Sequence, residues 1–153
     1  MKKLITLSLA ALSFSSFAAT QADLILKGVV APILEISIAH ETVASNLDLS
    51  QSASNVKVAT LTEKSNYATG YKISARSTNG GKLVNVSDAN SFVNYSLTYN
   101  GSNVPLTTAA TPVYSTSNLK GTFTKDLKIS FNQPSNLSAG SHEDTVQFTI
   151  SQN

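Results

Sequence analysis

The residues that could carry chemistry in this chain are few, and their spacing does not build a reactive site. The two histidines, His40 and His142, are both followed by acidic residues. Neither has the spacing of a zinc-protease motif, in which two histidines four residues apart share one helix face. We interpret both as solvated loop histidines. The chain has no cysteine, which excludes thiol catalysis and cysteine-ligated metals.

Other catalytic patterns are missing as well. No serine lies in a Gly-x-Ser-x-Gly elbow, and no glycine-rich loop of the phosphate-binding type occurs. Asn79-Gly80-Gly81 is instead typical of a tight turn that needs positive φ. Asp48 and Asp126 fall in alternating segments, where a solvent-facing position explains them. We therefore expect a protein that is not an enzyme, with no catalytic residues, no metal and no cofactor, and a secreted hydrolase is disfavoured.

The aromatic residues raise a second kind of function, sugar binding. Tyr95 and Tyr99 alternate in phase with Val93 and Leu97, which favours packing in the core or at its rim. A stacking surface for a carbohydrate would be drawn from the five tyrosines of the chain: Tyr67, Tyr71, Tyr95, Tyr99 and Tyr114. A secreted or surface β-sandwich that binds carbohydrate as a monomer is thus the alternative function.

The beginning of the chain has the pattern of an export signal. Lys2 and Lys3 precede an apolar run, and cleavage after Ala18 satisfies the small-x-small rule, with cleavage after Ala22 as the second choice. We predict that residues 1–18 are a signal peptide. Its removal takes 2 of the 11 Lys and Arg residues, leaving 9 against 9 Asp and Glu. A neutral mature chain gives no electrostatic case for nucleic acid or an anionic membrane.

Alternating segments separated by turn signals dominate the rest of the chain. We predict strands over residues 33–38, 46–50, 56–61, 70–75, 92–99, 123–131 and 146–150. In the predicted strand 56–61, Val56, Val58 and Thr60 share one side. Asn100-Gly101 predicts a hairpin turn, and residues 107–120 a loop without regular structure. Short strands at this spacing indicate an all-β chain, an antiparallel β-sandwich of one domain.

A further strand-like segment follows the predicted signal. Leu24, Leu26, Gly28 and Val30 share one parity, and Lys27 has the other. Alternation alone also fits the first strand of a complete, self-sufficient sandwich. Two features instead favour an arm that joins the sheet of another molecule. The segment runs on to residue 38 with little turn signal, and no obvious extra strand follows the last predicted one.

The two ends of the chain resemble subunits of chaperone–usher pili. The segment Leu26-Lys27-Gly28-Val29-Val30 is similar to that family's donor strand, whose frequent form is apolar-x-Gly-x-apolar. The stretch from Ala139-Gly140 through Asp144-Thr145-Val146 resembles the start of its last strand. The lack of cysteines is similar to the cysteine-free branches. The ending Ser151-Gln152-Asn153 departs from the family, which often has an aromatic residue next to last.

The resemblance implies an immunoglobulin-like sandwich over residues 31–153 that lacks its final strand, preceded by a donor-strand arm over residues 19–30. It implies polymerisation by insertion of this arm into the groove of the next copy. The implied donor residues are Leu24, Leu26, Gly28 and Val30, and the implied edge strand of the acceptor groove carries Val146, Phe148 and Ile150. Implied partners are further copies, a periplasmic chaperone, an outer-membrane usher and a host receptor or glycan. The implied location is the cell surface, reached through the periplasm.

Overall fold

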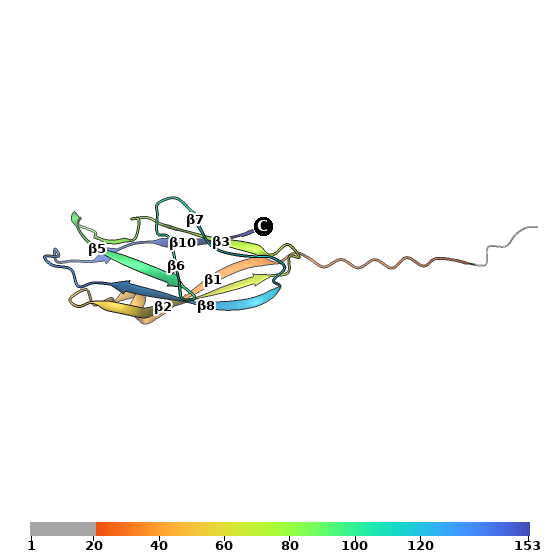
Figure 1. Cartoon of the computed structure of the whole chain (residues 1–153), viewed down its shortest axis with the longest axis horizontal. Helices are drawn as coiled ribbons and strands as arrows, with labels where there is room; N and C mark the ends of the chain where they lie inside the picture. Colours follow the sequence, from red (N-terminus) through yellow and green to blue (C-terminus); the bar gives the residue numbers. More distant parts are fainter. Residues whose placement is uncertain (1–20) are drawn as a thin grey trace, which may run out of the picture. The chain divides into compact units, whose positions relative to one another are not determined.

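The computed structural model describes residues 21–153, so the predicted signal peptide lies outside the described residues. The chain divides between Val30 and Ala31 into two units, which are described separately. Residues 21–30 have neither helix nor strand. Residues Ala31–Asn153 form a domain of antiparallel strands (Figure 1). Among the described residues, no helix is long and apolar enough to cross a membrane.

The domain consists of two antiparallel sheets, drawn as two layers in Figure 1. The larger sheet has the order β1-β2-β8-β5-β4-β9, with β6 paired to β5, and the smaller sheet has the order β10-β3-β7. The strands are β1 (Leu34–His40), β2 (Ala53–Ser65), β3 (Tyr71–Ser77), β4 (Lys82–Asn85), β5 (Asp88–Tyr99), β6 (Ser102–Asn103), β7 (Thr111–Thr116), β8 (Gly121–Phe131), β9 (His142–Glu143) and β10 (Val146–Gln152), with one 3-10 helix, η1 (Thr42–Ser45). The predicted fold class, an all-β antiparallel sandwich, is confirmed.

The core consists of the inward side chains of alternating residues. One cluster joins both sheets, with Leu61 from β2, Ala75 from β3 and Leu127 from β8 among its buried members. A second cluster contains Leu83, Val93, Ile129 and Phe131. The predicted face of Val93, Leu97 and Tyr99 is therefore the core face of β5, and the odd-numbered residues Leu127, Ile129 and Phe131 form the core face of β8.

Two predicted assignments are wrong. Residues 46–50 form no strand, because the Asp48 carboxylate accepts hydrogen bonds from the Ser50 N–H (2.9 Å) and the Ser50 hydroxyl (2.6 Å), which stabilise a turn. The same bonds lower the pKa of Asp48. Residues 107–120 are not without regular structure, since they contain β7. This strand is an edge of the smaller sheet, a position where Pro112 is tolerated.

The predicted face of β2 is also wrong. The pairing of β2 with β8 shifts register between Lys57 and Ala59, as at a β-bulge. The extra residue reverses the parity beyond it, so that Ala59, Leu61 and Glu63 are buried and Thr60 is only half-buried. The bulge cannot be seen in a sequence that alternates without a break.

The two predicted turns are confirmed. Gly80 and Gly81 have φ of 63° and 79°, and Asn100 and Gly101 have φ of 49° and 86°. In the second pair both central residues are left-handed, which matches the twist of the β5–β6 hairpin. The turn at Gly80 connects β3 in the smaller sheet to β4 in the larger one.

Candidate functional site

The most distinctive feature of the domain is a pair of free strand edges. Within residues 21–153, β1 pairs only with β2 and β10 pairs only with β3. An immunoglobulin sandwich has strands A-B-E-D in one sheet and C-F-G in the other. Here β1-β2-β8-β5 corresponds to A-B-E-D, and β3 and β10 correspond to C and F. The free edge of β10 is thus the position that strand G takes in a complete sandwich.

Both edge strands carry apolar side chains that are only half-buried. Ile36, Ile38, Val146 and Phe148 pack against the first core cluster. In the inner strands β2 and β3, by contrast, Leu61 and Ile73 are fully buried. We call this surface the acceptor face, after the role that the resemblance implies for β10, and define it by six half-buried residues: Leu34, Ile36, Ile38, Val146, Phe148 and Ile150. The three β10 residues named from the sequence lie on this face together with three β1 residues that the sequence did not single out, and their role as an acceptor stays a prediction.

The segment that contains the predicted donor residues exposes its apolar side chains. Leu24, Leu26 and Val30 are 82–85% exposed, and Ile25 (88%) and Val29 (85%) are exposed to a similar extent. Apart from Gly28 itself and its two chain neighbours, no described atom lies within 4 Å of where a Cβ would stand on Gly28. An uncovered run of this kind is typical of a surface that binds a partner. The six residues of the acceptor face lie in the domain Ala31–Asn153, whereas these exposed side chains lie in segment 21–30, which is described separately.

Asn66 marks the place where the domain begins. Its Oδ1 accepts a hydrogen bond from the Ile33 N–H (2.8 Å), and its Nδ2 donates to the Ala31 carbonyl (2.7 Å). The Asn66 N–H donates to the Ile33 carbonyl (3.2 Å). Three bonds from one residue therefore hold Ala31 and Ile33 to the turn after β2. No signal in the sequence identifies this role, because the partners are more than thirty residues apart.

Asp144 anchors the start of β10. Its carboxylate accepts hydrogen bonds from the Ser77 hydroxyl (2.5 Å), the Asn79 N–H (2.9 Å) and the Tyr95 hydroxyl (2.7 Å). These donors come from the end of β3, the β3–β4 turn and β5. Burial, followed by the hydrogen bond to Asp144, raises the pKa of Tyr95. The network thus fixes the point where β10 enters the smaller sheet.

Tyr71, Tyr99 and Tyr114 pack against one another rather than forming an exposed stacking surface. Tyr71 and Tyr99 are buried, and their hydroxyls donate to the buried carboxylate of Glu63, at 2.7 Å for Tyr71. Burial first, and then Glu63, raises the pKa of both tyrosines. Tyr114 packs beside them, with ring centroids 6.2 Å from Tyr71 and 5.7 Å from Tyr99. Sequence reasoning missed Glu63 because the bulge in β2 turns it inward.

The histidines are placed differently from the prediction. His142 is not in a solvated loop: it is half-buried in β9, with Nε2 3.2 Å from the Ser91 hydroxyl and Nδ1 3.2 Å from the Gly140 carbonyl oxygen. His40 is exposed, but it lies at the end of β1 rather than in a loop. Among residues 21–153, no three His, Asp or Glu side chains are grouped so that they could hold a metal ion.

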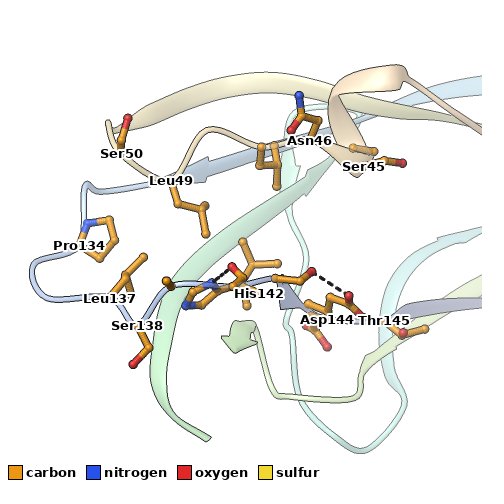
Figure 2. Close-up of a pocket in the computed structure, with 17 residues that line it drawn as sticks. Ser45, Asn46, Leu49, Ser50, Pro134, Leu137, Ser138, His142, Asp144 and Thr145 are labelled. Atoms are coloured by element: carbon orange, nitrogen blue, oxygen red, sulfur yellow. Dashed lines mark hydrogen bonds between the residues drawn. The ribbon is translucent and has the colours of Figure 1, made fainter. Parts of the chain in front are cut away.

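An open pocket of about 790 Å³ lies beyond the ends of β1 and β10. One wall, Ala44–Ser50, follows β1 through η1, and the other contains residues 137–145, which lead into β10. Figure 2 shows Leu49 and Leu137 on the two sides, with His142 and Asp144 on the lower one. The pocket therefore combines leucines with a polar rim. It was not predicted, because its walls are far apart in the sequence.

Comparisons with known proteins add little to this geometry. No protein-family model matches the chain. No curated protein matches it at a significant level. Among solved structures, it is similar to the CooA pilin subunit from enterotoxigenic Escherichia coli, with 16% sequence identity and a TM-score of 0.39 over 62% of this chain and 68% of that one. The likeness is too small to bear on function, which has to be inferred from the strands themselves.

Proposed function

We propose that this protein is a structural subunit of a surface fibre, in which the arm of one copy adds as a strand to the acceptor face of the next. The observation that carries this proposal is that one chain has both an exposed apolar segment and a sandwich with unpaired strand edges. Segment Leu24–Val30 exposes five apolar side chains, and those of Leu24, Leu26 and Val30 share one parity with Gly28. In the domain, β1 and β10 each have an unpaired edge beside half-buried apolar residues. Strand addition supplies backbone partners to such edges and side chains to the pockets between them.

The lengths of the two surfaces agree and suggest a register. Leu24–Val30 has seven residues, as does β10. Strand G of a sandwich is antiparallel to F, so we place the arm antiparallel to β10, with Val30 opposite Val146. Gly28 then faces Phe148, and Leu26 faces Ile150. The arm residue without a side chain is set against the bulkiest inward residue of β10, as close packing requires.

The energy of this joint is large enough for a lasting contact. Covering Leu24, Leu26 and Val30 contributes roughly 1.5–3 kcal/mol each. Each backbone hydrogen bond made by the arm adds about 0.5–1.5 kcal/mol, and the acceptor face is covered at the same time. Association and ordering of the arm oppose these terms. We expect a net stabilisation that makes dissociation slow.

The arrangement propagates by itself. The arm and the acceptor face are different surfaces of one chain, so the contact is heterologous and extends into an open fibre. Before joining, each acceptor face exposes strand edges that invite aggregation. A periplasmic chaperone that covers this face and an outer-membrane usher that delivers subunits to the cell surface fit that need. A host receptor or glycan would bind the finished fibre.

Deleting the arm tests the proposal. The mature chain should form ladders on denaturing gels run without heating, and the chain without residues 19–30 should form none. Addition of a peptide of residues 21–30 should raise the melting temperature of the deleted chain. A monomer whose stability is changed neither by the deletion nor by the peptide would contradict the proposal.

A further inference from the structure

We infer that the pocket beyond the ends of β1 and β10 receives the opposite end of the next copy, so that each joint has a second, body-to-body contact. This inference rests on the proposed function and deepens it. We call the end of the domain that carries Asn66 the arm pole. The end that carries the walls of the pocket, residues 44–50 and 137–145, is the far pole.

The strand registers place these two ends at opposite sides of the domain. Leu34 pairs with Ser65, and Ser65 pairs with Gly121, next to Asn66 at the arm pole. At the other end, His40 leads into η1, and Val146 follows the 137–145 wall. An arm that runs antiparallel to β10 therefore has its Val30 at the far pole of the copy that accepts it. The donor's own domain follows directly.

The arm has no slack between the two domains. Asn66 holds Ala31 and Ile33 to the arm pole, so the domain starts immediately after Val30. If Val30 lies opposite Val146, Ala31 of the donor is only about 3.4 Å further along, the rise of one residue in an antiparallel strand. The arm pole of the donor must then abut the far pole of the acceptor.

The position and chemistry of the pocket suit this occupant. Its walls continue β1 and precede β10, so a strand added between these two leaves the sandwich beside the pocket. Leu47, Leu49 and Leu137 offer apolar surface, and Pro32 at the arm pole is exposed. Charge agrees as well, since exposed Lys120 precedes β8 at the arm pole and exposed Glu143 lines the pocket. The partner that fits is a second copy of this chain.

The inference is tested by comparing how fast an isolated arm and a whole subunit leave the same acceptor. The acceptor is the mature chain with Leu24→Asp and Leu26→Asp, which removes its ability to donate. The peptide probe is residues 21–30. The donor subunit carries a second copy of Leu24–Val30 after Asn153, joined by a short turn, so that its own acceptor face is filled while its N-terminal arm is free. Labelled complexes are diluted into excess unlabelled peptide, and the dissociation rates are measured.

Two changes should remove the body-to-body contact without touching the arm. Four Gly and Ser residues inserted between Val30 and Ala31 of the donor separate the domains, and Ala139→Trp in the acceptor fills the pocket. Ala139 is exposed and lines the pocket. Ala109→Trp is the matched control, because Ala109 is an exposed loop residue outside the pocket lining.

The expected result is that the whole donor dissociates at least tenfold more slowly than the peptide. The insertion and Ala139→Trp should each bring the donor to the rate of the peptide, and Ala109→Trp should leave it unchanged. Equal rates for the unmodified donor and the peptide would overturn the body-to-body contact and leave strand addition intact. Failure of both probes to bind would overturn strand addition, and this inference with it.

Discussion

Replacement of Gly28 by leucine should weaken the joint, and a second replacement in the partner should restore it. In the proposed register Gly28 of the arm faces Phe148 of β10, whose half-buried side chain packs against the core. A leucine at this position would meet the phenylalanine ring. Phe148→Ala in the acceptor would vacate that space, so the two changes together should bind better than Gly28→Leu alone.

The size of the effect follows from the cost of overfilling a packed site. Extra methylene groups forced into such a site cost about 1–3 kcal/mol, which corresponds to a roughly 5- to 150-fold weaker joint. Contacting residues show coupling energies of about 0.5–3 kcal/mol, and we expect rescue within that range. Lys27→Leu adds the same side chain on the opposite parity, and Lys27→Ser removes a charge there. Both should change binding little.

The assay is binding of labelled arm peptides, residues 21–30 with each replacement, to the acceptor chain that carries Leu24→Asp and Leu26→Asp. The same acceptor with Phe148→Ala, Val146→Ala or Ile150→Ala is measured in parallel. Selective rescue by Phe148→Ala confirms the register. Rescue by Val146→Ala or Ile150→Ala would show that the arm is shifted by two residues. Equal losses from Gly28→Leu and Lys27→Leu would refute the assignment of the faces.

Two further predictions concern the domain itself. Asp144→Ala leaves the Ser77 hydroxyl, the Asn79 N–H and the Tyr95 hydroxyl without their acceptor. It should lower the free energy of unfolding, measured by urea denaturation, by about 1–3 kcal/mol. An effect no larger than that of Glu143→Gln, a control at an exposed site, would contradict the anchoring role. The raised pKa of Tyr99 means that, above the ordinary tyrosine value of about 10, the unfolded chain loses a proton that the folded chain keeps. The contribution of Tyr99 to stability should therefore be full below pH 10 and should fall as the pH rises toward the folded-state pKa. The melting temperature should decrease with pH in this range, and Tyr99→Phe should make that decrease less steep. An unchanged slope in this variant would count against the assignment.

The strands that follow simple alternation could be predicted from the sequence. Val93, Leu97 and Tyr99 in β5, and Leu127, Ile129 and Phe131 in β8, alternate without interruption and face the core. Where the backbone departs from a period of two, prediction failed. The bulge near Val58 reverses the face of β2, and this reversal hid the buried Glu63.

Short strands, and polar contacts between segments far apart in the chain, could not be predicted from the sequence either. β4 has four residues and β9 has two. They are supported by pairing, β4 with β5 and β9 with β4, rather than by their own composition. β7 cannot be told from a loop by its composition, because serine, threonine and proline suit an edge strand and a loop equally well. Parity alone sufficed to predict the half-buried face of β10, with Val146, Phe148 and Ile150, whereas the donor role of segment 24–30 stays a prediction. The contribution of β1 to the acceptor face required the order of the strands in the two sheets.

The central claim, that the arm of one copy completes the sandwich of another, can be tested most directly by disulfide trapping. The chain has no cysteine, so a designed pair is unambiguous. Leu26 and Ile150 face each other in the proposed register, at a cross-strand separation that a disulfide can span with small adjustment. The mature chain with Leu26→Cys and Ile150→Cys should form covalent ladders on non-reducing gels, and the off-parity pair Lys27→Cys with Ile150→Cys should not. A disulfide found within single monomers, or equal ladders from both pairs, would contradict the account.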